Sequence, residues 1–178
     1  MFPIFALSFR TYIMKIIIAG AGEVGFHLAK LLSYESLDIT LIDTLKDRLN
    51  YAEGHLDIKT LRGNASSLAV LKESDTSESD LFIAVTASES VNITICALAK
   101  QLGCKRTIAR ISNTEFTNAD QSISFQDIGV DELISPEELA ADEIQQLLDQ
   151  SAFTNSYEFE EGALTMIGYF RSWVNHKL

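Results

Sequence analysis

The sequence predicts an α/β fold in which helices cover both faces of a doubly wound parallel sheet. Two observations lead to it: apolar strand-like runs alternate with helical segments along the chain, and the first run enters a glycine-rich loop. Continuous apolar runs are typical of parallel strands that are buried on both faces. A repeated β–α–β order joins such strands by right-handed crossovers.

The glycine-rich loop lies in residues 15–25, which read KIIIAGAGEVG. A strand at 15–19 leads into the spacing G-x-G-x-x-G, and a helix at 23–33 follows at once. In such loops the first glycine permits a tight turn, the second lets a pyrophosphate approach, and the third lets the helix pack closely on the strand. Free N–H groups at the helix start also bind phosphate. We therefore expect a Rossmann-type nucleotide site that includes Gly20, Ala21, Gly22, Glu23, Val24 and Gly25.

The remaining elements complete a six-stranded parallel sheet. The expected strands are 38–42, 58–61, 80–85, 107–111 and 132–134, and the expected helices are 45–53, a short one ending at Leu71, 88–102 and 137–150. Gly103 is the expected C-terminal glycine of the helix 88–102. Pro136 lies in the first turn of the last helix, where proline is favoured. Residues 157–169 alternate weakly around Glu161 and Gly162, which is typical of a hairpin.

This order suggests three parts. Residues 1–13 are apolar but fall short of the ~20 residues that span a membrane, and they lack a basic start and a cleavage site. We expect an N-terminal extension that is poorly ordered unless it packs on a partner, with Met14 as an alternative start. Residues 14–150 form the nucleotide-binding domain, and residues 151–178 begin a linker or a C-terminal hairpin.

Charge and cysteine content narrow the function. The 178 residues carry a net charge of −11, which argues against binding to duplex nucleic acid, because its phosphates call for a basic surface. The two cysteines, Cys96 and Cys104, have neither C-x-x-C spacing nor paired histidines. A metal site is therefore not supported, and we expect a reduced cytosolic pair.

Asp43 closes the second expected strand, eighteen residues beyond Gly25. An acidic side chain at this place can accept both hydroxyls of an adenosine ribose and would repel a 2′-phosphate, so NAD fits better than NADP. The alternative is a helix N-cap, a role that aspartate also fills well. Thr44 and Arg48 lie close by, and Arg48 is equally consistent with a solvated helix residue.

Other candidates follow the later strands. Thr86 lies at the carboxyl edge, where ligands bind in such sheets, and forms a T-x-x-E capping box with Glu89. Ala87 is small enough to let that loop approach a ligand. Asn64 would lie near the adenine or serve as a plain turn residue. Arg110 could reach a phosphate or a neighbouring subunit, or form a structural ion pair.

The sequence contains no recognisable catalytic set. The Y-x-x-x-K spacing of short-chain dehydrogenases and the G-x-S-x-G elbow are both missing. The expectation is therefore a binding protein and not an enzyme. Two rivals stay open: the cofactor-binding half of an NAD-dependent oxidoreductase, and a dimerisation scaffold with a vestigial nucleotide site.

Several motifs occur in an order that resembles a known family. They are KIIIAGAGEVG from Lys15, LIDT from Leu41, GNAS from Gly63, AVTASESVN from Ala84, IARI from Ile108 and GVDELISPE from Gly129. Together they are similar to the RCK (KTN) domain, most closely the first such domain of the NAD-binding regulatory subunit of the Trk potassium uptake system. The similarity runs from about Met14 to Ile167.

The resemblance implies a non-catalytic Rossmann-type domain. In the family such domains dimerise and join a larger ring in the cytoplasm, beneath a membrane-embedded potassium transporter. Nucleotide binding biases the ring, so this domain would be peripheral to the inner face of the membrane through its partner. The implied contacts of NAD or NADH are residues 20–24, Asp43, Thr86 with Ala87, and Arg110.

Two departures qualify the resemblance. The chain ends before the ligand-sensing subdomain of full-length members, which fits a fragment, a truncated product or an engineered form. Relatives that prefer ATP tend to carry an arginine at the position of Glu23. A carboxylate beside a γ-phosphate is unfavourable, so the resemblance favours NAD or NADH, with ATP or ADP as the alternative.

Overall fold

The computed structural model describes residues 12–113, 116, 124–151, 153–159 and 164–169. The chain divides into two compact units, the first ending at Ser135 and the second beginning at Pro136. This division precedes the last helix, whereas the expected domain boundary follows it, at residue 150.

The first unit is built on a six-stranded parallel sheet, as predicted. Its strands are β1 (Lys15–Ala19), β2 (Asp38–Asp43), β3 (Lys59–Arg62), β4 (Leu81–Ala84), β5 (Arg106–Arg110) and β6 (Glu132–Ile134). They are arranged in the order β3-β2-β1-β4-β5-β6, and every neighbouring pair is parallel. The strand order reverses between β1 and β4, and sheets of this kind bind ligands at the carboxyl ends of the strands around that point.

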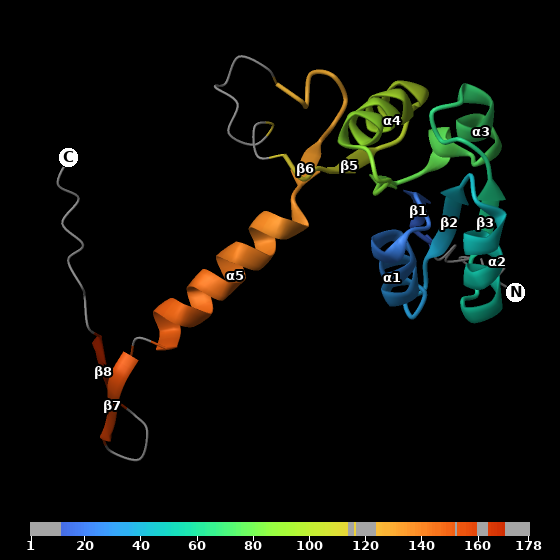
Figure 1. Ribbon diagram of the computed structural model, residues 1–178. Helices are drawn as coiled ribbons and strands as arrows, with labels where there is room; N and C mark the ends of the chain where they lie inside the picture. The colour runs from blue at the N-terminus through green and yellow to red at the C-terminus, as the bar shows by residue number, and fades with distance from the viewer. Residues whose placement is uncertain (1–11, 114–115, 117–123, 152, 160–163, 170–178) are drawn as a thin grey trace, which may run out of the picture. The chain divides into compact units, whose positions relative to one another are not determined.

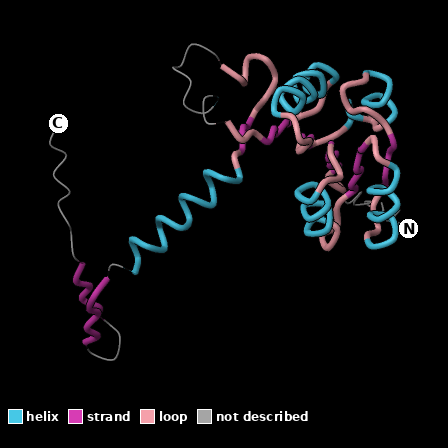
Figure 2. The backbone as a smooth tube through the Cα atoms, in the orientation of Figure 1, coloured by secondary structure: helices cyan, strands magenta, loops and turns pink. Residues whose placement is uncertain are grey.

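Helices cover both faces of this sheet. They are α1 (Glu23–Leu32), α2 (Lys46–His55), α3 (Leu68–Glu73) with the short 3₁₀ helix η1 (Thr76–Glu78), and α4 (Glu89–Leu102). Figure 1 shows α1 and α2 on one side of the sheet and α3 and α4 on the other. The same layering is visible in the tube of Figure 2, where the loops at one end of the strands lead into the helices.

Strand β1 explains why two cores form. Its residues are almost fully buried, and neighbouring side chains point to opposite faces of the sheet. Ile16 and Ile18 pack in the cluster with Ala29 of α1, whereas Ile17 and Ala19 pack in the cluster around α4. A central strand with two apolar faces needs the continuous run of isoleucines that the sequence provides.

The C-terminal end of α4 matches its sequence signal, and its N-terminal end is capped by a serine. Ser88 is its N-cap residue, and the Ser88 hydroxyl accepts a hydrogen bond from Val91 N–H. Gly103 ends the helix with φ +115°, in the left-handed region that favours glycine, and its N–H bonds to the Lys100 carbonyl. Most other boundaries differ from expectation by one or two residues; β5, for example, begins at Arg106 and ends at Arg110.

The second unit contains one helix and one hairpin. Helix α5 (Pro136–Ser151) begins at the proline, as expected. Strands β7 (Phe153–Phe159) and β8 (Leu164–Tyr169) pair in antiparallel fashion. The hairpin therefore begins at Phe153, four residues earlier than Tyr157 in the sequence. The expected turn at Glu161 and Gly162 lies outside the described residues.

A polar cluster anchors the chain before β1. Asp80 is buried, and its carboxylate accepts hydrogen bonds from Tyr12 Oη, Lys15 N–H (2.8 Å) and Lys105 Nζ (2.6 Å). The hydrogen bond from Lys105, followed by those from Tyr12 and Lys15, lowers the pKa of Asp80 to about 2. Tyr12 thus has defined contacts inside the expected extension 1–13, of which residues 1–11 lie outside the described part.

No helix in the described ranges is both long enough and apolar enough to cross a membrane. Within the same residues, no group of three or more His, Cys, Asp or Glu side chains is placed to hold a metal ion. Both cysteines are buried and free.

Candidate functional site

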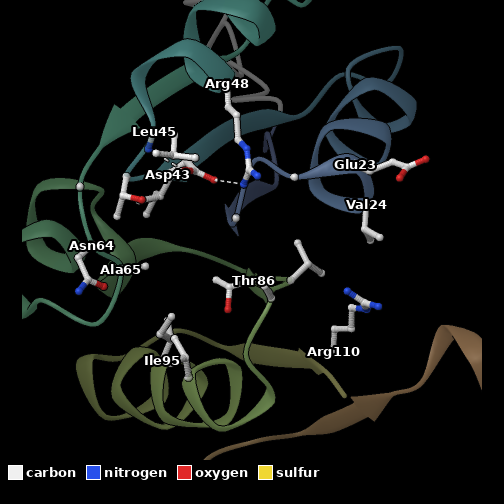
Figure 3. Close-up of a pocket in the computed structure, with 18 residues that line it drawn as sticks. Glu23, Val24, Asp43, Leu45, Arg48, Asn64, Ala65, Thr86, Ile95 and Arg110 are labelled. Atoms are coloured by element: carbon white, nitrogen blue, oxygen red, sulfur yellow. Dashed lines mark hydrogen bonds and ion pairs between the residues drawn. The ribbon is translucent and has the colours of Figure 1, made fainter. Parts of the chain in front are cut away.

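A pocket of about 560 Å³ opens at the carboxyl ends of β1 to β5 (Figure 3). Its volume falls in the range of sites for small molecules and cofactors, ~300–1,000 Å³. All but two of the expected site residues line it: Gly20, Gly22, Glu23, Val24, Asp43, Asn64, Thr86, Ala87 and Arg110. Residues from five separate segments therefore meet at the switch point of the sheet.

Ala21 and Gly25 are the two expected residues that do not line the pocket. Ala21 contributes its backbone N–H, which donates to Asp43 Oδ2 at 2.7 Å. Gly25 lies against the turn, where a Cβ would overlap the carbonyl oxygen of Gly20. Both residues support the loop on the side away from the pocket. The pocket side is formed by Gly20, Gly22, Glu23 and Val24.

The turn at Gly20 requires glycine for two reasons. Its φ of +108° lies in the left-handed region, and a Cβ there would come within 2.9 Å of the Val85 carbonyl oxygen. The Gly20 N–H donates to the Ile42 carbonyl at 2.8 Å, and Val85 N–H donates to the Ala19 carbonyl at 2.8 Å. The loop is thus held between the ends of β2 and β4.

Helix α1 directs its N-terminus toward the pocket. Gly22 is its N-cap residue, and no described side chain caps the first turn. The N-terminus of a helix carries free N–H groups and a partial positive charge, which together attract phosphate. Glu23 begins the helix, and in Figure 3 its carboxylate points away from Asp43.

The Asp43 side chain connects three parts of the site. It is 8 % exposed, Oδ2 accepts from Ala21 N–H, and Oδ1 accepts from Leu45 N–H at 2.8 Å. Arg48 Nη1 lies 3.6 Å from Oδ2. The N-cap residue of α2 is Leu45, so the alternative of Asp43 as a helix cap is wrong. Its carboxylate instead joins the glycine loop to the start of α2.

Thr86 does not form the expected capping box with Glu89. The cap of α4 is Ser88, and the Glu89 carboxylate accepts from Asn113 N–H at 2.9 Å. Thr86 instead binds Asn92: its N–H and its hydroxyl donate to Asn92 Oδ1 at 2.9 and 2.6 Å. The hydroxyl is therefore directed to α4, and in Figure 3 it points toward the side of Ile95.

Asn64 occupies the rim of the pocket at the end of β3. Its side-chain Oδ1 accepts from Ser66 N–H at 2.9 Å, and its carbonyl accepts from Ser67 N–H at 2.9 Å. These contacts stabilise the turn before α3. Asn64 is therefore a turn residue that also lines the pocket, and its expected place near the adenine stays a prediction.

Sequence reasoning assigned no role to the apolar side chains of the pocket wall. These are Ile42, Leu45, Ala65, Val85, Val91 and Ile95. Their position along the chain is a signal that could have identified them. Each lies at the end of a strand, or in the turn or the first helical turns that follow it. An apolar wall of this kind suits a flat aromatic ring, while the glycine loop suits an anion.

The ionisable side chains around the pocket are two carboxylates and two guanidinium groups: Glu23, Asp43, Arg48 and Arg110. Cysteine, histidine, lysine and tyrosine are missing from the described lining. The arrangement can hold an anionic, hydroxyl-bearing ligand by charge and hydrogen bonds.

The family model described as the TrkA-N domain matches residues 16–136, which run from the second residue of β1 to the first residue of α5 and contain the whole pocket. The chain belongs to the TrkA-N domain family. The resemblance to RCK domains, and the Rossmann-like fold that it implies, are thereby confirmed.

Among curated relatives, the Trk system potassium uptake protein TrkA of Halomonas elongata is 37 % identical over 155 residues. That match covers 86 % of this chain and 34 % of the relative. TrkA of Haemophilus influenzae is 41 % identical over 137 residues, or 76 % of this chain and 30 % of the relative. The chain thus spans about a third of the length of these curated relatives.

Solved structures share the fold. The TrkA-N domain of the inner membrane protein ybaL from Escherichia coli has a TM-score of 0.67 at 17 % identity, covering 78 % of this chain and 98 % of that one. GsuK bound to ADP has a TM-score of 0.61 at 24 % identity, covering 78 % and 34 %. The GsuK channel bound to NAD has a TM-score of 0.57 at 14 % identity, covering 83 % and 24 %.

Proposed function

We propose that this domain is a nucleotide-binding regulatory module of a potassium uptake system, and that NAD or NADH is its ligand. The observation that carries the proposal is the position of Asp43, whose buried carboxylate holds the glycine loop and faces the same pocket. An acidic residue at the end of the second strand accepts the ribose hydroxyls of NAD in folds of this type. The phosphates would lie on the glycine loop and the first turn of α1.

Several findings support a nucleotide at this place. Solved structures that share the fold are described as bound to ADP and to NAD, and the pocket of this chain pairs an apolar wall with a glycine loop of the kind that binds phosphate. Glu23 favours NAD or NADH over ATP, because a third phosphate would add negative charge beside a carboxylate. ATP and ADP remain the alternative ligands.

The regulatory role rests on the relatives and on the lining of the pocket. The curated relatives carry the name of a potassium uptake protein, and the pocket offers charged and hydrogen-bonding groups that suit recognition of a nucleotide. The domain would act as a homodimer or larger ring in the cytoplasm, associated with a membrane potassium transporter. The rival is the cofactor half of an oxidoreductase, which predicts oxidation of NADH in the presence of a substrate.

Calorimetric titration of NAD, NADH, ATP and ADP into the purified chain tests the nucleotide. We expect NAD or NADH to bind, and Asp43→Asn to weaken that binding about tenfold because the charged acceptor is lost. Asp38→Asn is the matched control, since Asp38 lies at the opposite end of β2 and pairs with Lys59. Absence of binding by all four nucleotides, or equal affinity in both variants, contradicts the proposal.

A further inference from the structure

Arg48 bridges two parts of the pocket that a nucleotide would occupy at the same time. Its Nη1 lies 3.6 Å from Asp43 Oδ2, and the same atom would lie 3.8 Å from a Cβ built on Gly22. In Figure 3 the guanidinium reaches from α2 between the carboxylate and the glycine loop. The Arg48 side chain is 51 % exposed, whereas that of Asp43 is 7 % exposed.

The carboxylate of Asp43 has limited capacity for another partner. Oδ1 already accepts from Leu45 N–H, and Oδ2 accepts from Ala21 N–H. A carboxylate offers about four lone-pair sites, so a ribose diol needs those that the backbone leaves. The Arg48 guanidinium forms an ion pair with Oδ2. A ribose diol and the guanidinium would therefore compete for the same carboxylate.

Arg48 can leave Asp43 easily and has a second anion within reach. The Arg48 side chain is half exposed and lies 3.6 Å from Oδ2, beyond hydrogen-bond distance, so the ion pair is weak, and the arginine stem is flexible. A phosphate on the glycine loop would lie next to the guanidinium, whose planar fork suits phosphate oxygens. Glu23 also begins the helix beside that loop, so a phosphate there would benefit from a nearby cation.

We propose that Arg48 is an exchangeable counter-ion: it pairs with Asp43 in the empty site and transfers to a phosphate when a nucleotide binds. The proposal rests on nucleotide binding at this pocket. It makes Arg48 a specificity residue that favours ligands carrying both a ribose diol and a phosphate. The diol releases the arginine, and the phosphate receives it.

Ligands that differ in one group separate the two halves of this exchange. Adenosine has the diol without a phosphate, so Arg48 only competes with it. ADP and NAD have both groups, so Arg48 is first a competitor and then a partner. NADP carries an additional 2′-phosphate on the ribose, which would be a different partner for the same cation.

The experiment measures the affinities of adenosine, ADP, NAD and NADP for the full chain and for Arg48→Ala, Arg48→Lys and Lys46→Ala. Lys46 is the control, because it is the first residue of the same helix and does not line the pocket. In Arg48→Ala we expect ADP and NAD to bind about tenfold more weakly, and adenosine to bind equally well or better. Arg48→Lys should fall between the wild type and Arg48→Ala, and Lys46→Ala should match the wild type.

Other patterns overturn the inference. If Arg48→Ala weakens the binding of adenosine and ADP equally, Arg48 contacts the ribose or stabilises the fold. If the variant binds all ligands more tightly, Arg48 only competes with them. Weakening of NADP alone would assign it to the 2′-phosphate. If the wild-type chain binds none of the four ligands, the nucleotide function fails as well; if it binds them and Arg48→Ala changes nothing, only the exchange fails.

A crystal structure of the ADP complex would test the exchange of Arg48 independently of the affinities. The exchange requires the Arg48 guanidinium to lie about 3 Å from a phosphate oxygen and the ribose hydroxyls to occupy Asp43. An arginine that still pairs with Asp43 in that complex would contradict it.

Discussion

The side-chain amide of Asn92 holds the Thr86 loop through three hydrogen bonds. Asn92 Oδ1 accepts from the Thr86 N–H and from its hydroxyl, and Asn92 Nδ2 donates to the Thr86 carbonyl at 3.2 Å. The same Nδ2 donates to the Arg110 carbonyl at 2.9 Å. Asn92 is 1 % exposed, so one buried amide ties the loop after β4 to the end of β5, on the wall of the pocket.

Removing this amide should destabilise the domain and loosen the pocket together. In Asn92→Ala the partly buried backbone groups of Thr86 and Arg110 lose the hydrogen bonds that the amide makes with them, and an unsatisfied group costs up to about 1–3 kcal/mol. We expect a loss of about 2–4 kcal/mol in the free energy of unfolding, measured by urea denaturation, and weaker nucleotide binding. Thr94→Ala, on the exposed side of the same helix, should change stability by less than about 0.5 kcal/mol. A stability loss no larger than that of the control would contradict this role.

The glycine loop allows ligand binding and folding to be tested separately. A Cβ at Gly22 would meet only the flexible Arg48 side chain at 3.8 Å, and the φ of Gly22 is −72°. We expect Gly22→Ala to keep the melting temperature of the wild type and to lose nucleotide affinity, because the methyl group blocks the close approach of a phosphate. Calorimetry and thermal unfolding measure the two effects. Unchanged affinity would show that phosphates do not approach Gly22.

Gly25→Ala should have the opposite profile, since its Cβ would overlap the Gly20 carbonyl oxygen and α1 would have to move. We expect a loss of about 1–3 kcal/mol in the free energy of unfolding, as in other overpacked sites. Gly54→Ala is the matched control. A Cβ at Gly54 meets nothing within 4 Å in helix α2, so this change should stabilise the chain by about 0.5–1 kcal/mol. Equal stability of the two variants would contradict the packing role of Gly25.

The fold could be predicted from the sequence because its signals are local. Each signal is a pattern within a few neighbouring residues: the isoleucine run of β1, the glycine spacing of the loop and the terminal glycine of α4. The capping box failed because two hydroxyl residues, Thr86 and Ser88, compete for one helix end. Ser88 is the N-cap residue, and the Thr86 hydroxyl donates a hydrogen bond to Asn92, which lies one turn into the helix.

The contacts among site residues could not be predicted in the same way. Asp43 and Ala21 are far apart in sequence, and their hydrogen bond depends on the parallel pairing of β1 with β2. A sequence pattern indicates that an aspartate ends a strand, but not which donors meet its carboxylate. The position of Arg48 over that carboxylate also depends on the orientation of α2. These relationships arise from tertiary structure.

Asp80 should make stability fall in acid. Its pKa is lowered from 3.8 to about 2, first by the hydrogen bond from Lys105. A carboxyl whose pKa is depressed in the folded state stabilises that state above its unfolded pKa, and the stabilisation is lost as the pH falls through the folded pKa. The difference in unfolding free energy between wild type and Asp80→Asn should be at most about 2 kcal/mol at neutral pH and should shrink between about pH 4 and pH 2. Urea denaturation across this range measures it, and a constant difference would contradict the assignment.

The two cysteines should be inert in the folded protein. Burial raises the pKa of Cys96 to about 12 and also raises that of Cys104. Their exposed fractions are 0 % and 3 %, and the thiolate is the reactive form. We expect DTNB to react with neither thiol in native buffer at mildly alkaline pH and with both in urea. Native reaction that is slow and follows the rate of unfolding agrees with this expectation. Fast reaction in the native state would show that the core around α4 opens more readily than its packing indicates, and Cys96→Ala and Cys104→Ala would identify which thiol is reached.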